Sequence, residues 1–422
     1  MSDTVSMETL HGRGANDLGT AGDQQAKNHR ETDQLPKPLV DDDGRPLRTG
    51  TLWTVSAHII TAVIGSGVLS LAWGVAQLGW VAGPAVMVLF AAVIYYTSTL
   101  LAECYRCGDP MFGLRNRTYI DAVRATLGDS KEKLCSAIQL SNLFGIGIGI
   151  GVTIAASDPC HASTSPYIAI FGVMQIVFSQ IPDLDKVWWL SIVAAIMSFS
   201  YSAIGDTIKS PPPSEAKVMK KATAVSVAVT TVIYLLCGCV GYAAFGDAAP
   251  DNMLTGFGFY EPFWLLDVAN VFVVVHLVGT YQVMTQPIFA YVERRAAAAW
   301  PGSVLVRERE VRVRRIMAFS VSPIRMAWRT AYVCVTTAVA MLLPFFGSVV
   351  GFIGAASFWP LTVYFPVEMY IAQHKVEQGS TRWLLLHALS AGCLVVSVAA
   401  AAGSIAGVVE ELKAHEPFCW SC

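Results

Sequence analysis

The stretch that decides the fold is residues 52–77, LWTVSAHIITAVIGSGVLSLAWGVAQ, which contains no Asp, Glu, Lys or Arg. A helix that spans a bilayer needs about 20 mainly apolar residues, and this run is long enough. Its middle reads Ile64-Gly65-Ser66-Gly67-Val68, and each glycine disfavours helix by ~1 kcal/mol relative to alanine. The stretch therefore predicts a membrane helix that is broken near the middle of the bilayer.

Two explanations account for glycines at this depth. Irregular backbone inside a membrane is tolerated only where protein or a watery cavity satisfies its polar groups. Many secondary transporters use a broken helix as a substrate site, because the second half offers free N–H groups and a positive dipole end to a carboxylate. The alternative is a Gly/Ser packing groove against a neighbouring helix. This segment alone does not decide between them.

The composition places the chain among integral membrane proteins. Hydrophobic residues make up 54% of the 422 residues and charged residues 14%, and the mean hydropathy is +0.50, as expected for a polytopic membrane protein. The sequence shows no nucleotide-binding loop, zinc cluster or nucleophile with its base. We therefore expect no enzyme, no cofactor, no metal and no nucleic-acid partner.

One cysteine pair requires a separate comment. Cys104 and Cys107 follow the second apolar segment with the spacing Cys-x-x-Cys. This spacing occurs in redox and metal sites, but such a site needs further ligands, and the sequence offers none nearby. We therefore expect these cysteines to be structural.

The chain divides into three predicted regions. Residues 1–48 are polar, mixed in charge and poor in aromatics, which predicts a disordered cytosolic tail without a secretory signal. Residues 49–409 form the transmembrane domain, and residues 410–422 form a short extracellular tail. Ten apolar segments are predicted spans: 52–77, 79–102, 134–156, 166–181, 187–205, 222–245, 263–291, 330–346, 349–373 and 384–409. So many spans with short loops favour a transporter over a receptor or an anchored enzyme.

The charges of the loops predict which side of the membrane each loop occupies, because cytosolic loops are enriched in Lys and Arg. Loops 103–133, 206–221 and 292–329 are basic and read as inside. Three predicted spans separate the first two of these loops, and an odd number cannot return the chain to the same side. Either 166–181 does not cross, or a helix is missing near residue 205, or four lysines are translocated, which is the least favoured option.

Several motifs, all after residue 45 and in collinear order, resemble one known family. They are residues 56–73 (SAHIITAVIGSGVLSLAW), 180–183 (QIPD), 188–191 (WWLS), 211–215 (PPPSE), 241–247 (GYAAFGD), 276–283 (HLVGTYQV), Pro287 and 359–361 (WPL). The chain resembles the plant amino acid permeases of the amino acid/auxin permease family. The resemblance implies an all-α polytopic membrane protein of the plasma membrane, with eleven helices in a five-plus-five inverted repeat. It further implies broken first and sixth helices and proton-coupled uptake of amino acids.

Against that family pattern, the sixth helix is predicted to be absent. Residues 202–205 run directly into Asp206-Thr207-Ile208-Lys209, which in the family follows a whole further helix. The loss would explain the odd number of spans and would remove half of the implied substrate site. The alternative function is then a transport-inactive truncated or splice-variant member that associates with full-length permeases. If the loss impairs folding, retention in the endoplasmic reticulum is expected.

The first candidate site is the break itself. Ile64, Gly65, Ser66 and Gly67 are predicted to bind the substrate carboxylate through backbone N–H groups and the half-helix dipole. Three polar residues of other spans could line the same cavity: Asn142, Tyr281 and Gln282. For these three, a hydrogen bond between packed helices is the alternative.

Three titratable residues in the spans are candidates for proton coupling: His58, His276 and Asp267. Ionisable groups inside a membrane are functional candidates by default, and histidine titrates near physiological pH. Each histidine could instead form a hydrogen bond between helices. Asp267 lies near the outer end of its span, so hydration or packing explains it equally well.

A run of glycines at every second position marks the third span. Gly145, Gly147, Gly149 and Gly151 cannot all lie on one helix face, because a helix repeats every 3.6 residues. We interpret the run as a sign of close packing or local flexibility rather than a phosphate-binding loop.

Overall fold

The structure is a computed structural model, and every residue that it describes lies after the division between Arg48 and Thr49. The described residues are 52–64, 66–108, 113, 115–116, 118–155, 165–180, 215–256, 263–307, 309–313 and 317–414. The predicted tail 1–48, the predicted span 187–205 and the motifs at 181–183, 188–191 and 211–214 therefore fall outside the description.

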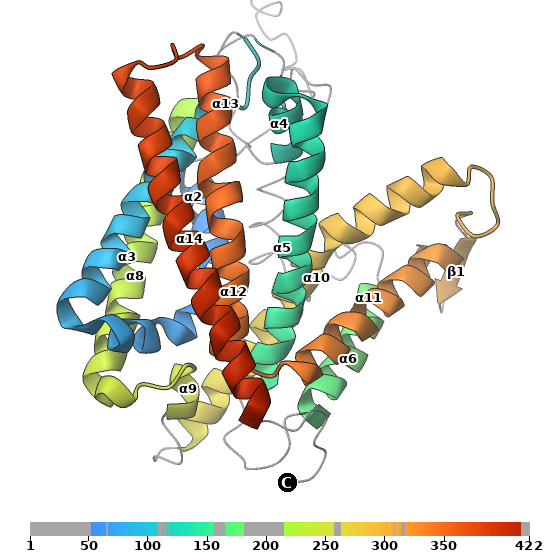
Figure 1. Cartoon of the computed structure of the whole chain (residues 1–422). Coiled ribbons are helices and arrows are strands. Elements are labelled where there is room, and N and C mark those ends of the chain that lie inside the picture. Colours follow the sequence, from blue (N-terminus) through green and yellow to red (C-terminus); the bar gives the residue numbers. More distant parts are fainter. Residues whose placement is uncertain are drawn as a thin grey trace, which may run out of the picture. The chain divides into compact units, whose positions relative to one another are not determined.

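The described chain is helical apart from one short hairpin, in agreement with the predicted all-α polytopic fold (Figure 1). The main helices are α2 (Leu52–Val63), α3 (Leu71–Glu103), α4 (Tyr119–Leu127), α5 (Asp129–Ala155), α6 (Ser165–Ser179), α8 (Glu215–Phe245), α10 (Phe263–Ala299), α11 (Pro323–Leu342), α12 (Phe346–Ser357), α13 (Phe365–Gln373) and α14 (Thr381–Ala414). The 3₁₀ turns η1 (Ser66–Ser70) and η3 (Gly246–Ala248), the π-helical segment η4 (Phe358–Tyr364) and the short α9 (Met253–Gly256) complete the helical set.

Among the described residues, six helices are long and apolar enough to cross a membrane. They correspond to six of the ten predicted spans. Of the other four, 52–77 is interrupted by the break, 166–181 corresponds to the 15-residue α6, 330–346 corresponds largely to α11, and 187–205 is not described. The predicted boundary at residue 409 also differs from the structure, in which α14 continues to Ala414.

The first helix is broken where the sequence predicts it. Helix α2 ends at Val63, Ile64 forms a bend, and η1 begins at Ser66. A second interruption follows at Gly79, whose φ of +78° divides α3 into residues 71–78 and 80–103. Because only glycine adopts such a φ without strain, this residue lets the chain turn sharply from the first span into the second.

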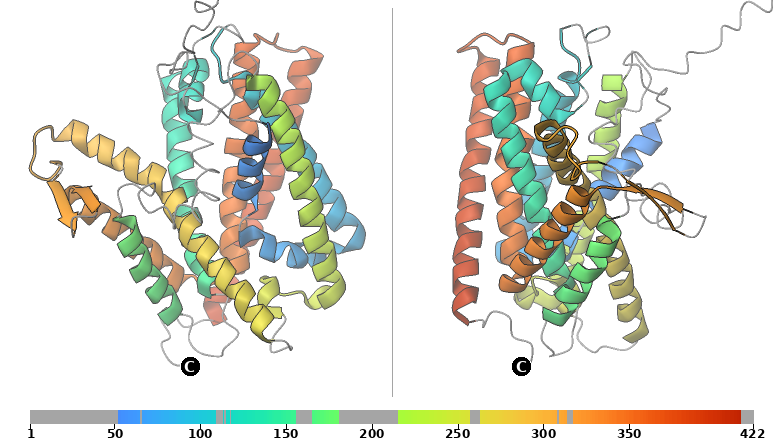
Figure 2. Two further views of the ribbon diagram at one scale, coloured as in Figure 1. Left: turned by 180° about the vertical axis from the view of Figure 1, so that it is seen from behind. Right: turned by 90° about the vertical axis from the view of Figure 1, so that its right-hand side faces the viewer.

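The helices form two groups that differ in their contacts (Figures 1 and 2). In the first group, which we call the α8 group, α8 packs along both α2 and α3. In the second, the α10 group, α5, α6, α10 and α11 pack against one another around a core that includes Leu277, Phe289 and Tyr332. Helices α12 and α14 pack together, and α12 also contacts α5.

The glycine run of α5 explains how that helix packs on two neighbours at once. A Cβ at Gly145 would lie 3.0 Å from Ile353 of α12, and one at Gly149 would lie 3.5 Å from the same side chain. A Cβ at Gly151 would lie 3.0 Å from Ala340 of α11, and Gly147 also faces α11. The alternate glycines thus form two i, i+4 pairs on two faces, which confirms the close-packing interpretation.

Polar contacts place two predicted inside loops on the same side. Lys220, near the start of α8, forms an ion pair with Glu103, the last residue of α3. His374, just after α13, also lies close to this carboxylate, with its Nε2 3.0 Å from Oε2 of Glu103. Loops 103–133 and 206–221 therefore meet at one end of the α8 group.

The position of helix α6 is relevant to the odd number of predicted spans between the basic loops 103–133 and 206–221. The carbonyl of its last residue, Ser179, accepts a hydrogen bond of 2.7 Å from Arg329, in the second turn of α11. Helix α6 therefore brings the chain back to the side of the basic loop 292–329, and the idea that 166–181 does not return is not supported. The predicted span 187–205 and the predicted absence of the sixth helix lie outside the described residues.

The basic loop 292–329 is more structured than predicted. Helix α10 continues to Ala299, and α11 begins at Pro323, with Ser322 as its N-cap. Between them β1 (Arg309–Val313) and β2 (Met317–Val321) form an antiparallel hairpin that pairs Val311 with Phe319. The hairpin and the adjoining helix ends project to one side of the other helices (Figures 1 and 2).

Candidate functional site

The break between α2 and η1 is held by a few specific hydrogen bonds. The N–H of Ile64 still donates to the carbonyl of Ile60 at 2.9 Å, so the helical pattern continues to that residue. Beyond it, the hydroxyl of Ser70 donates to the carbonyl of Gly67 at 2.9 Å. Gly65 and the side chain of Ser66 are not described. The first N–H groups of η1 have no helical acceptor, because the helix starts there.

The carbonyl of Val63 receives an external partner. In a continuous α-helix it would accept the N–H of Gly67, four residues on. Here the hydroxyl of Tyr234, from α8, donates to it at 2.6 Å. An orphaned carbonyl in a membrane costs several kcal/mol, so this contact stabilises the end of α2.

Gly67 is open to its surroundings. It is exposed, and a Cβ at this position would meet no described atom within 4 Å. The packing-groove alternative requires a neighbouring helix against the glycine, and the described residues provide none there. Leu69, two residues later, is buried in a core with Val152, Ile168 and Phe346. The 3₁₀ turn η1 is thus anchored in the core through Leu69 and is open to its surroundings at Gly67.

Tyr281 and Gln282 lie in a second polar cluster, inside the α10 group. The hydroxyl of Tyr281 lies 2.8 Å from Oγ1 of Thr336 on α11. The amide of Gln282 donates to the side chain of Gln175 on α6, whereas its own Oε1 is buried without a described partner. Both residues are almost fully buried. Their observed contacts are of the helix-to-helix kind, and no described hydrogen bond joins this cluster to the break.

The remaining candidates are less well determined. Asn142 on α5 is half-buried, and no described residue forms a hydrogen bond with its side chain. His276 on α10 is half-buried. His58 lies in α2 and Asp267 in α10, and the positions of their side chains are not described. The described residues therefore do not test whether the three proton-coupling candidates act together.

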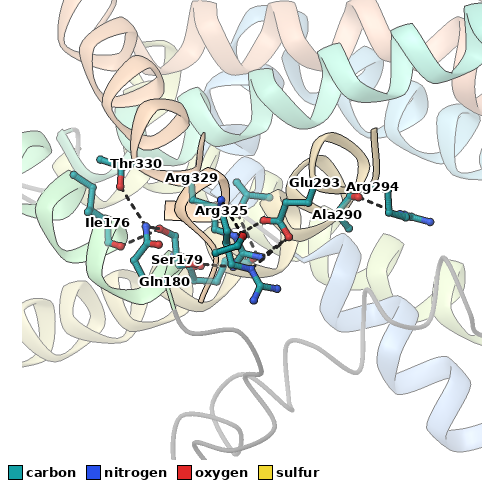
Figure 3. A network of polar contacts seen from close by, with 12 residues as sticks. Ile176, Ser179, Gln180, Ala290, Glu293, Arg294, Arg325, Arg329 and Thr330 are labelled. Atoms are coloured by element: carbon teal, nitrogen blue, oxygen red, sulfur yellow. Dashed lines mark hydrogen bonds and ion pairs between the residues drawn. The ribbon is translucent and has the colours of Figure 1, made fainter. Parts of the chain in front are cut away.

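A buried ion pair fixes the end of the α10 group next to the basic loop (Figure 3). The guanidinium of Arg329, 2% exposed, lies with its Nε 2.7 Å from Oε1 of Glu293 on α10. Arg325 approaches the other oxygen of the same carboxylate at 3.4 Å. With the bond to Ser179, Arg329 joins α6, α10 and α11 at one point. It is a structural junction, which the sequence analysis treated only as part of a basic loop.

Cys104 and Cys107 are free cysteines, as expected. Cys104 is fully buried, and its thiol donates to the carbonyl of Leu100. Burial, together with the nearby Glu103 carboxylate, raises the pKa of the Cys104 thiol to about 12. A buried thiol that stays protonated is a weak nucleophile, and among the described residues no group of three or more possible metal ligands includes this pair.

Comparison with known proteins identifies the family. The model for "Transmembrane amino acid transporter protein" matches residues 48–210 and 202–410. The chain belongs to this family. Amino acid permease 3 of Arabidopsis thaliana is 51% identical over 90% of this chain and 95% of its own length. Amino acid permease 2 of the same plant is 52% identical over 91% of this chain and 93% of its own length. The resemblance to plant amino acid permeases is thereby confirmed.

One solved structure shows a distant likeness. The crystal structure of MhsT in complex with L-phenylalanine matches with a TM-score of 0.48 and 11% sequence identity, covering 85% of this chain and 100% of that one. At that score the likeness does not bear on the fold.

The comparisons also show where this member differs from its relatives. The alignment with amino acid permease 3 extends over 452 positions, more than the 422 residues of this chain, so the relative has residues that this chain lacks. The two family-model matches meet at residues 202–210, which is where the sixth helix is predicted to be absent. The chain is a multi-pass membrane protein of the amino acid transporter family, and its alignment with this relative requires gaps in the chain.

Proposed function

We propose that the chain is a proton-coupled amino acid symporter that imports amino acids across the plasma membrane, with its N-terminal tail in the cytosol. The family membership supports amino acid transport as the activity. Proton coupling and the cellular membrane follow from the resemblance of the motifs. The proposed partners are the amino acid substrate, protons as the coupling ion, and the lipid bilayer that surrounds the spans.

The observation that carries this proposal is the open break of the first helix. The start of η1 presents N–H groups that have no helical acceptor, beside a Gly67 that has open space around it. A helix start of this kind attracts an anion, and every amino acid substrate carries a carboxylate. Asn142, Tyr281 and Gln282 remain proposed cavity residues, and His58, His276 and Asp267 remain proposed proton carriers.

The test is uptake by yeast cells that lack their own amino acid permeases. We expect the chain to accumulate labelled proline or glutamate, and to do so faster as the external pH falls. Surface labelling shows whether each protein reaches the plasma membrane.

A pair of glycine variants then tests the site. Gly65→Val should abolish uptake at unchanged surface level. Gly74→Val, in the first turn of α3 at a position where a Cβ meets no described atom within 4 Å, should retain it. Unchanged uptake in Gly65→Val contradicts the proposed carboxylate site.

The missing internal segment favours a second candidate function. A member without half of its implied substrate site would associate with full-length permeases and regulate them without transporting. This candidate rests on the predicted absence of the sixth helix and on the relative's longer alignment, which extends over 452 positions. Co-purification with an intact relative such as amino acid permease 3, together with no uptake by the chain alone, is the expected result. Failure to bind the relative at matched expression excludes it, and retention in the endoplasmic reticulum would indicate a folding defect instead.

A further inference from the structure

Helix α8 contacts the broken helix on both sides of the break. Before the break, Oγ of Ser56 donates to the carbonyl of Ala222 at 3.4 Å. Oγ of Ser226 lies 3.2 Å from the carbonyl oxygen of Ser56, although its shorter contact, 2.7 Å, is with the carbonyl of Ala222 in its own helix. At the break, Tyr234 donates to Val63. Ala222, Ser226 and Tyr234 follow one another at spacings of four and eight, in a row that winds around the helix by about 40° for every four residues.

The same row of α8 residues receives the second half of the helix through glycines. A Cβ at Gly238 would lie 2.9 Å from Val75, and one at Gly241 would lie 2.5 Å from the Cβ of Ala72. Ala72 and Val75 are each 1% exposed, so residues 71–78 are pressed against α8. The two glycines continue the series of Ser226 and Tyr234 at spacings of four and three.

Tyr234 lies between these two sets of contacts. Its hydroxyl occupies the carbonyl of Val63 that would otherwise accept the N–H of Gly67 if α2 continued unbroken. A continuous helix through Val63 and Gly67 would have to share this carbonyl with the tyrosine hydroxyl. The contact therefore disfavours the continuous helix relative to the broken one. The N–H of Gly67 is left without that acceptor at the position where the substrate carboxylate is proposed to bind.

We propose that Tyr234 is a positioning residue that holds the first helix open at its break, with the row on α8 formed by Ala222, Ser226, Tyr234, Gly238 and Gly241 as its support. Tyr234 does not touch the substrate. It acts by keeping the N–H groups at the start of η1 available. This inference rests on the proposed function for its effect on uptake but not for its effect on the backbone.

The test compares two variants that each remove one hydroxyl from α8. Tyr234→Phe removes the bond to Val63. Tyr242→Phe is the matched control, because its hydroxyl donates to Asp247 at 2.8 Å and not to the broken helix. Hydrogen–deuterium exchange of the purified full-length protein is measured on peptides that cover residues 59–70.

We expect exchange in Tyr234→Phe to differ from the parent protein by about 2- to 10-fold, the effect of one net hydrogen bond, and to be unchanged in Tyr242→Phe. In the uptake assay, Tyr234→Phe should raise KM by a similar factor with little change in the maximal rate. Gly241→Ala, which pushes on Ala72, should raise KM in the same direction.

The outcomes separate this inference from the proposed function. If the parent protein takes up no amino acid, the proposed function fails, and the exchange experiment still tests the contact. Exchange in Tyr234→Phe equal to that of the parent overturns the inference, even if uptake is normal. Altered exchange with an unchanged KM would also overturn it, because Tyr234 would then be structural without positioning the site.

Discussion

The break beside α8 and the Arg329 junction both supply partners to polar groups at helix ends, yet they do so in opposite ways. At the junction a fully buried guanidinium binds a carboxylate and a carbonyl from two other helices. At the break one neutral hydroxyl from α8 binds one carbonyl, and Gly67 nearby is open. The junction therefore joins three helices through a buried charge, whereas the first helix packs on α8 before and after its break and has open space at the break itself.

The largest expected effect is on stability, at the junction. Arg329→Met leaves Glu293 without its closest partner and Ser179 without its donor. Breaking a fully buried pair costs roughly 3–5 kcal/mol. Because Glu293 keeps Arg325 at 3.4 Å, we expect a loss at or below the lower end of that range. Thermal unfolding of the purified protein in detergent should show a large fall in Tm. Arg294→Met is the control, because Arg294 is exposed and donates only to the carbonyl of Ala290 in its own helix.

A double variant distinguishes the ion pair from the packing. In Arg329→Met with Glu293→Leu both charges are gone, and replacing a buried pair by apolar residues is often close to neutral. We expect much of the lost Tm to return. If the double variant is less stable than Arg329→Met alone, the unpaired carboxylate is not the cause of the loss.

A smaller effect is expected where α5 packs on α11. Gly151→Val forces a side chain against Ala340, whose Cβ would lie 3.0 Å from the added Cβ. Overpacking of this kind costs typically 1–3 kcal/mol. Gly392→Val on α14 is the control, since a Cβ there meets no described atom within 4 Å. Equal Tm values for the two variants would show that the glycine run is not needed for close approach.

Two buried tyrosines of the α10 group should respond in opposite directions. Tyr281→Phe removes the hydrogen bond to Thr336 and should lower the free energy of unfolding by about 1 kcal/mol. Tyr332→Phe removes a buried hydroxyl that has no described partner, so it should be neutral or stabilising. Chemical unfolding of both variants in the same detergent measures the difference. A loss of equal size in Tyr332→Phe would mean that its hydroxyl has a partner.

Much of the fold follows from the sequence, because membrane spans are local features. Long apolar runs and glycine interruptions predict α3, α8, α14 and the break at Ile64–Gly67 without knowledge of neighbours. The division of the glycine run into two faces also follows from the helical repeat. What the glycines face, Ile353 on one side and Ala340 on the other, could not be predicted, because these residues are distant in the sequence.

The site was predicted less completely than the fold. The break was located from its own residues, but Tyr234 was missed, since its role depends on α8 lying beside α2. A tyrosine in the middle of an apolar span was the available signal, and the serines and threonines of the same span do not set it apart. Arg329 was missed for a different reason: within an arginine-rich loop, nothing in the sequence separates a buried arginine from those that only mark sidedness.

The smallest structural effect and the most specific functional one are expected at Gly67. A methyl group there meets no described atom within 4 Å, and a substitution without clash usually changes stability by less than about 0.5 kcal/mol. Gly67→Ala should therefore leave Tm unchanged, while the added methyl narrows the space in front of the η1 N–H groups and raises KM for uptake. Gly74→Ala is the control, because Gly74 lies seven residues later, in α3, and a Cβ there also meets no described atom within 4 Å. It should change neither quantity. A normal KM in Gly67→Ala would place the carboxylate elsewhere and leave the open break without a role in binding. A fall in Tm would instead show that a neighbouring residue packs on this glycine. The break would then be a closely packed site, as the Arg329 junction is.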